Sequence, residues 1–173
     1  MRAAAAVLIA TLVAATPLLA QDDDDDDEDA ALGAVVKSAP VTLEQGLRAS
    51  QREGMPISGK FEFEVDGAQL SVYTARGDAF SEVIVDHRSG AIAKVIPISE
   101  GNDLAEAKEQ MDLMRGAERS LDDAAVAALK THPGYRAVSA TPGRKDGVPL
   151  VKIVLTNGAE WATVYEPLKG GSR

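Results

Sequence analysis

Apolar and polar positions follow the same order of patterns twice along this chain. Each time, a stretch with apolar residues at helical spacing precedes several stretches in which apolar and polar residues alternate. Helical spacing indicates an amphipathic helix, and alternation indicates a half-buried strand. The two stretches cover residues 41–97 and 119–168, and corresponding positions lie about 80 residues apart. The pattern predicts an α+β fold with two repeats, each of one helix packed on a small antiparallel β-meander.

In the first unit, the pair Thr42 and Gln45 has the spacing of a capping box, which predicts a helix start. The helix is expected to end at residues 54–56, where Gly and Pro occur. A strand is expected next, because two phenylalanines alternate with acidic residues, and Asp66–Gly67 is typical of a hairpin turn. Later strands are expected over residues 70–75, 79–85 and 91–96.

In the second unit, Ser120 and Asp123 repeat the helix start. This helix is expected to have one apolar stripe, formed by Leu121, Ala124, Ala125, Ala128 and Leu129. Three strands are expected, over residues 135–141, 150–156 and 159–166. Pro142–Gly143 is expected to end the first of them, and hairpin turns are expected at Asp146–Gly147 and Asn157–Gly158.

Residues 98–118, between the two units, have the pattern of an amphipathic connector helix. Asp103 is expected to cap it, with Glu106 at the capping-box position. The apolar residues at helical spacing are Leu104, Ala107, Met111 and Met114. We expect this stripe to pack on one or both sheets. The alternative is an adaptable binding groove, which methionine side chains can also form.

The N-terminus, residues 1–20, has the composition of a signal peptide. Arg2 precedes an apolar run that Thr16–Pro17 interrupts, and Ala20 is a small residue suited to cleavage. Cleavage after Ala20 would leave a periplasmic or secreted protein without a membrane segment. The alternative is an uncleaved anchor, because a membrane span needs about 20 apolar residues. The chain has no cysteine, so disulfides and lipidation of a cysteine are both excluded.

Residues 22–29 are all acidic and account for most of the formal net charge of −9. Such a tract repels itself, so residues 21–40 are expected to be a disordered acidic tail and linker. Residues 169–173 are expected to fray. Weak association of small cations such as Ca²⁺ is the alternative role of the tract, because Ca²⁺ prefers carboxylate oxygens. The acidic charge argues against nucleic acid and anionic membranes as partners.

The first unit ends in the phrase Val-Asp-His-Arg-Ser-Gly-Ala-Ile over residues 85–92. A capped helix, a short meander and this closing phrase resemble the PepSY domain, with the turn formed by Asp86, Ser89 and Gly90. The second unit departs from the pattern, because residues 167–170 read Pro-Leu-Lys-Gly at the corresponding place. The resemblance implies a non-enzymatic module of exported bacterial proteins. Such domains occur in propeptides of thermolysin-like metallopeptidases and are associated with restraint of peptidases.

No catalytic constellation is evident in the sequence. The chain lacks the His-Glu-x-x-His motif, and its two histidines, His87 and His132, fall in expected turns of different units. Asp86, His87 and Ser89 are too close together on one turn to take the mutual geometry of a catalytic triad. We therefore expect no enzyme activity and no cofactor.

The aromatic residues are the remaining candidates for a binding surface. Phe61 and Phe63 are expected in the core, whereas Tyr73, Trp161 and Tyr165 could either pack inward or contact a protein partner. The expected function is that of an exported binding protein which docks a peptidase or envelope protein through a sheet edge or face. The alternative is an extracytoplasmic protein that binds or senses small cations.

Overall fold

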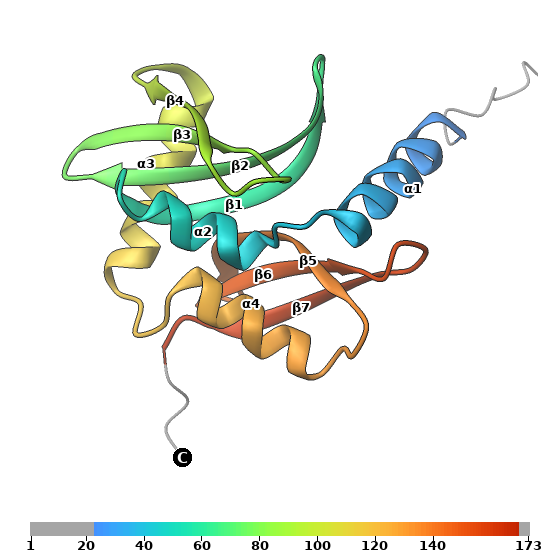
Figure 1. The fold of residues 1–173 in the computed structure, drawn as a ribbon. Coiled ribbons are helices and arrows are strands. Elements are labelled where there is room, and N and C mark those ends of the chain that lie inside the picture. The colour runs from blue at the N-terminus through green and yellow to red at the C-terminus, as the bar shows by residue number, and fades with distance from the viewer. Residues whose placement is uncertain (1–22, 170–173) are drawn as a thin grey trace, which may run out of the picture.

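The computed structural model describes residues 23–169 and has four helices and seven strands in that range (Figure 1). In chain order the elements are α1 (Asp23–Ser38), α2 (Leu43–Ser50), β1 (Met55–Glu64), β2 (Gly67–Arg76), β3 (Ala79–Val85), β4 (Ile92–Ile98), α3 (Gly101–Arg115), α4 (Leu121–Lys130), β5 (Arg136–Lys145), β6 (Val148–Thr156) and β7 (Trp161–Pro167). The fold class is α+β, as expected.

All seven strands form one antiparallel sheet in the order β4-β3-β2-β1-β5-β6-β7. One helix followed by three strands occurs twice, as α2-β1-β2-β3 and as α4-β5-β6-β7. The two halves meet through their first strands, because Gly59 of β1 pairs with Ala140 of β5, and Lys60 with Ser139. This short ladder joins the two meanders into one sheet, which the sequence does not predict.

Of the expected hairpin turns, the one at Asp146–Gly147 is present as predicted. The first hairpin turns one residue earlier than predicted, at Val65 and Asp66, because Gly67 already pairs with Glu64 in the ladder. Asp146 and Gly147 have φ values of 53° and 79°, and two consecutive positive values are what the tight two-residue turn requires. At Asn157 the connection is a four-residue loop instead of a two-residue turn. The Asn157 Oδ1 atom accepts hydrogen bonds from the N–H groups of Ala159 (3.0 Å) and Glu160 (2.9 Å). Strand β7 therefore begins at Trp161, two residues later than expected.

The prediction that Pro142–Gly143 ends a strand is wrong, because β5 continues to Lys145. The two-residue turn makes Lys145 and Val148 a hydrogen-bonded pair, and such pairs alternate along an antiparallel ladder. Pro142 therefore lies in a non-hydrogen-bonded pair, and its nitrogen points away from β6. On that side the ladder to β1 includes only Ser139 and Ala140, so β5 loses no hydrogen bond at Pro142.

The start of β1 also differs from expectation. Helix α2 ends at Ser50, before residues 54–56, and Pro56 belongs to β1. The β1 register shifts between Pro56 and Ser58, which marks a bulge near the strand start where proline is tolerated. Phe61 is buried as expected, whereas Phe63 is only half-buried.

The sheet has one face against α2 and α4 and the other against α3. A Cβ atom at Gly59 would lie 3.0 Å from a methyl group of Leu47 in α2. The neighbouring Ser58 points to the opposite face, where its Oγ donates a hydrogen bond to Gln110 Oε1 of α3 at 2.7 Å. We call this second face, opposite α2 and α4, the open face. The core between the helices and the first face includes Leu43, Leu47, Phe61, Leu70, Val72, Val83, Leu121, Ala124, Ala140, Ile153 and Leu155.

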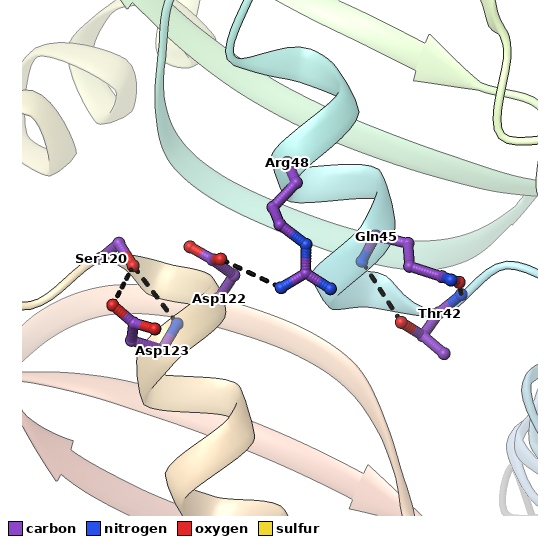
Figure 2. Close-up of polar contacts among 6 residues, drawn as sticks. All are labelled: Thr42, Gln45, Arg48, Ser120, Asp122 and Asp123. Carbon is purple, nitrogen blue, oxygen red and sulfur yellow. Dashed lines mark hydrogen bonds and ion pairs between the residues drawn. The ribbon is translucent and has the colours of Figure 1, made fainter.

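Helices α2 and α4 have the start signals that the sequence predicts, and an ion pair connects them (Figure 2). Thr42 and Gln45 form a complete capping box, with hydrogen bonds of 2.8 and 3.2 Å. Ser120 accepts the N–H of Asp123 and also donates its hydroxyl to the Asp123 carboxylate. Arg48 Nη1 of α2 lies 3.2 Å from Asp122 Oδ2 of α4. The expected apolar stripe of α4 is buried in four of its five positions.

The connector helix α3 is confirmed, but its predicted cap is wrong. Asp103 lies in the first turn of α3, and Glu100 is the N-cap without a side-chain capping bond. Of the predicted stripe, Ala107, Met111 and Met114 are buried, and Leu104 is half-buried. The stripe packs on the open face over β1, β2 and β5.

The expectation of a disordered tail and linker over residues 21–40 is wrong for residues 23–38, which form helix α1. Val36 is fully buried in the shared core and anchors the helix. The Arg136 guanidinium donates hydrogen bonds to the carbonyls of Lys37 (3.1 Å) and Ala39 (2.7 Å) at the end of α1. The acidic residues lie at the helix start, where the helix dipole favours negative charge. The predicted signal peptide and frayed end (170–173) lie outside the described residues.

Val36→Ala tests whether α1 belongs to the folded domain. Removing two buried methyl groups should lower the free energy of unfolding by about 2 kcal/mol. Val35→Ala, the same change at a half-buried neighbour, is the matched control and should cost less. Urea unfolding followed by the fluorescence of Trp161, the only tryptophan, measures both values. Equal and negligible effects would contradict the docking of α1.

Candidate binding site at the β7 edge

Strand β7 presents unpaired backbone groups along one edge of the sheet. The N–H of Asn157 donates to the carbonyl of Glu160 at 3.2 Å, which makes this a hydrogen-bonded pair of the β6-β7 ladder. Because such pairs alternate, Ala162, Val164 and Glu166 bond to β6. Trp161, Thr163 and Tyr165 therefore point their N–H and C=O groups outward. None of the described strands pairs with this side of β7.

The other edge strand, β4, is protected against pairing. Pro97 contributes no N–H, and Lys94 places a charge on the strand. The ladder between β3 and β4 also contains a register shift next to Val85. Proline, lysine and bulges are the devices by which proteins prevent pairing at sheet edges. Between Trp161 and Glu166, β7 contains no proline and no lysine.

The structure places all three candidate aromatics on the open face. Trp161 and Tyr165 share one face of β7, and the strand register puts Tyr73 of β2 on the same side, four strands away. Tyr165 is 45% exposed, and the Lys145 Nζ atom lies 4.1 Å from its ring centroid. Trp161 is half-buried at the start of β7. The sequence identified these aromatics, but it did not identify Thr163, Lys145 or Lys152, because their importance depends on the register between strands.

Tyr73 occupies a separate cleft between α3 and the sheet. The cleft measures about 230 Å³ and is lined by Ser58, Lys60, Tyr73, Asp103, Glu106, Gln110 and Thr141, among others. Burial raises the pKa of the Tyr73 hydroxyl well above its ordinary value, and the nearby carboxylates of Glu82 and Glu62 raise it further. Tyr73 therefore stays neutral at physiological pH, and α3 partly covers it.

The turn that resembles the PepSY phrase has a structural role in this chain. Asp86 Oδ1 accepts hydrogen bonds from the N–H groups of Arg88 (2.8 Å) and Ser89 (2.9 Å). Gly90 adopts a φ of 75°, which favours glycine, and its N–H donates to the Asp86 carbonyl. The His87 carbonyl accepts the N–H of Val41, so the turn holds the segment that enters α2. Asp86, Ser89 and Gly90 thus form one exposed turn, far along the sheet from the β7 edge.

The remaining titratable residues do not form a reactive cluster in the described part of the chain. His132 lies at the end of α4 with its Nδ1 atom 3.0 Å from Thr131 Oγ1, and His87 lies in the β3-β4 turn. Among residues 23–169 no group of three or more His, Cys, Asp or Glu residues is placed to hold a metal ion. Within the same range no helix is long and apolar enough to span a membrane.

Comparisons with known proteins give little guidance. No protein-family model matches the chain, and no curated protein matches it. One similar solved structure is that of a "putative lipoprotein" from Clostridium difficile 630, with 13% sequence identity and a TM-score of 0.41. The similarity covers 72% of this chain and 82% of that chain. The function must therefore be inferred from the residues of this chain.

Asp86→Asn tests how much the negative charge of Asp86, in the β3-β4 turn, contributes to the stability of the fold. The N–H groups of Ser89 and Arg88 lower the pKa of the Asp86 carboxyl below its ordinary value of 3.8. Its charge therefore stabilises the fold above that pH, and the contribution is lost as the pH falls through the lower folded value. The wild type should be more stable than the Asn variant at pH 7, and the gap should close on acidification.

Urea unfolding at a series of pH values between 7 and 2 measures this gap. Asp86→Ala is the control, because it removes the acceptor altogether and should be less stable than the Asn variant at every pH. A gap between wild type and Asp86→Asn that stays constant with pH would contradict the assignment.

Proposed function

We propose that the protein is an exported, non-catalytic binding protein that docks an extended polypeptide segment on the outer edge of β7. The main support for this proposal is the run of outward-pointing backbone N–H and C=O groups at Trp161, Thr163 and Tyr165. An extended segment that lies beside β7 would become an eighth strand of the sheet. Strand addition of this kind obtains affinity from main-chain hydrogen bonds and specificity from alternate side chains.

The side chains beside the edge support this mode of binding. Trp161 and Tyr165 flank Thr163 on the open face, so they would contact alternate side chains of the added strand. Large aromatic side chains supply much of the binding energy of protein interfaces. Neither aromatic is fully buried, and both are therefore accessible to a partner.

The family resemblance and the leader suggest where such a partner is found. We propose that residues 41–97 and 119–168 are two PepSY-like units, each with a helix on a meander. The composition of residues 1–20 supports export to the periplasm or the medium. A peptidase or another envelope protein is the partner that this combination favours. In this proposal the protein modulates its partner through contact, without a chemical step of its own.

Thr163→Pro tests docking at the β7 edge. Proline removes the outward N–H at the centre of the edge, and it leaves the ladder to β6 intact because Thr163 lies in a non-hydrogen-bonded pair. Partner affinity should fall roughly tenfold, because one hydrogen bond is lost and the proline ring obstructs the approaching strand. Thr163→Val keeps the N–H and should bind nearly as well as the wild type.

The measurement uses the chain without residues 1–20, cross-linked in an envelope extract and then assayed against peptidases purified from that extract. Recovery of one partner by wild type and Thr163→Val, with loss in Thr163→Pro, supports the proposal. Thermal unfolding shows whether the proline variant is folded. Equal recovery by a folded Thr163→Pro variant, or the absence of any partner and any effect on peptidase activity, would contradict docking at β7.

A further inference from the structure

A basic hollow adjoins the β7 edge on the open face. It measures about 340 Å³, and its lining includes Arg144, Lys145, Lys152 and Tyr165 but no acidic residue. Arg144 donates to the backbone carbonyl of Gly147, and Lys145 lies over the Tyr165 ring. In the described part of the chain, none of these three cations has an ion-pair partner. The hollow therefore has a local positive charge, although the whole chain is acidic.

The strand register directs this charge toward the β7 edge. Lys152 of β6 pairs with Tyr165 of β7, so the two side chains lie in one row across the open face. The next position in this row belongs to a strand added beside β7, about 5 Å further out. The Lys145 ammonium group, 4.1 Å from the Tyr165 ring centroid, already lies over the outermost residue of the row. A side chain of the added strand beside Tyr165 would therefore lie next to the Lys145 ammonium group and in the same row as Lys152.

The carboxylates near β7 do not cancel this attraction, because Glu166 is paired with a cation and Glu160 precedes Trp161, at the other end of β7 from Tyr165. Glu166 forms an ion pair with Arg119 at 2.7 Å. Glu160 accepts hydrogen bonds from the Tyr135 hydroxyl (2.9 Å) and the Asn157 amide (2.8 Å). The two lysines remain the cations available to a ligand at the outer edge.

We infer that the segment docked on β7 is an acidic extended segment of a partner protein, with carboxylate side chains on the open-face side. This inference rests on the proposed function and names the chemical class of its partner. Charge complementarity supports it, because Lys145 and Lys152 line the site and no carboxylate does. Affinity for such a segment should fall with added salt, since the lysines are at the surface.

The acidic tract of the same chain cannot occupy this site in cis. Residues 23–29 of the tract form the first turns of α1. The last turn of α1 is held at Arg136, the first residue of β5, whereas Lys145 is the last residue of that ten-residue strand. Only the tract of a second copy could reach the hollow. Self-association is therefore an outcome that the experiment must separate from binding of a partner.

The experiment titrates the chain without residues 1–20 with three synthetic eight-residue peptides. They alternate threonine with glutamate, with lysine or with serine, so they share strand propensity and differ in charge. Trp161 is the only tryptophan and lies on β7, so its fluorescence reports binding at the edge. The glutamate peptide should bind at least about fivefold more tightly than the serine peptide, and the lysine peptide most weakly.

Lys152→Glu should abolish the preference for the glutamate peptide while leaving the serine peptide bound. Lys94→Glu makes the same charge change on the opposite edge strand, β4, and should keep the preference. If Lys152→Glu leaves the preference unchanged, the inference is wrong, but docking at β7 stands. If none of the peptides binds, both the inference and the docking proposal fail.

Analytical ultracentrifugation tests the alternative that the acidic tract of a second copy, rather than a different protein, occupies the site. The chain without residues 1–20 should sediment as a monomer, with or without residues 21–29. Self-association that disappears when residues 21–29 are removed, together with loss of that association in Lys152→Glu, would assign the site to a second copy and overturn the inference of a separate partner.

Discussion

Two residue pairs between β1 and β5 determine the layout of the whole molecule. Because the halves meet through their first strands, each meander extends outward from the joint, and β4 and β7 become the edges. Gly59 makes the joint compact, since the absence of a side chain lets Leu47 of α2 pack directly over it. The same joint places α2 and α4 side by side, where Arg48 reaches Asp122. Had the halves met through their third strands, the β7 edge would lie inside the sheet.

Helix α3 makes the two halves unequal. Its buried stripe covers the open face over β1, β2 and β5, so Tyr73 lies in a narrow cleft there. Thr163, Tyr165 and Lys152, on the outer strands of the second half, remain exposed. The first half also keeps the ordered Asp86 turn and the protected strand β4, which extends its meander beyond β3. These differences favour a supporting role for the first half and a recognising role for the second.

Local signals in the sequence predict α2, α3, α4 and most of the turns and strands, because caps and turns depend on neighbouring residues. The capping box at Thr42 and the turn at Asp146 are examples. The sequence does not predict helix α1, because its stability comes from contacts between distant residues. These are the burial of Val36 in the core and the hydrogen bonds from Arg136 to the end of the helix. The extension of β5 through Pro142 is not predicted for the same reason, since the proline is tolerated there because the pairing of β5 with β1 includes only Ser139 and Ala140. The candidate site depends on register, so the sequence supplied its aromatics but not its edge or its cations.

The contrast between the two edges is the strongest internal argument that β7 has a binding role. An unprotected edge strand invites non-specific pairing, and this chain protects β4 with Pro97, Lys94 and a bulge. Lys145 and Lys152 protect β7 in a different way. Pairing of β7 with β7 of a second copy would place two basic hollows on the open face of one sheet, and their like charges would oppose it. The same charges attract an acidic strand, so one set of residues can exclude self-pairing and select a partner.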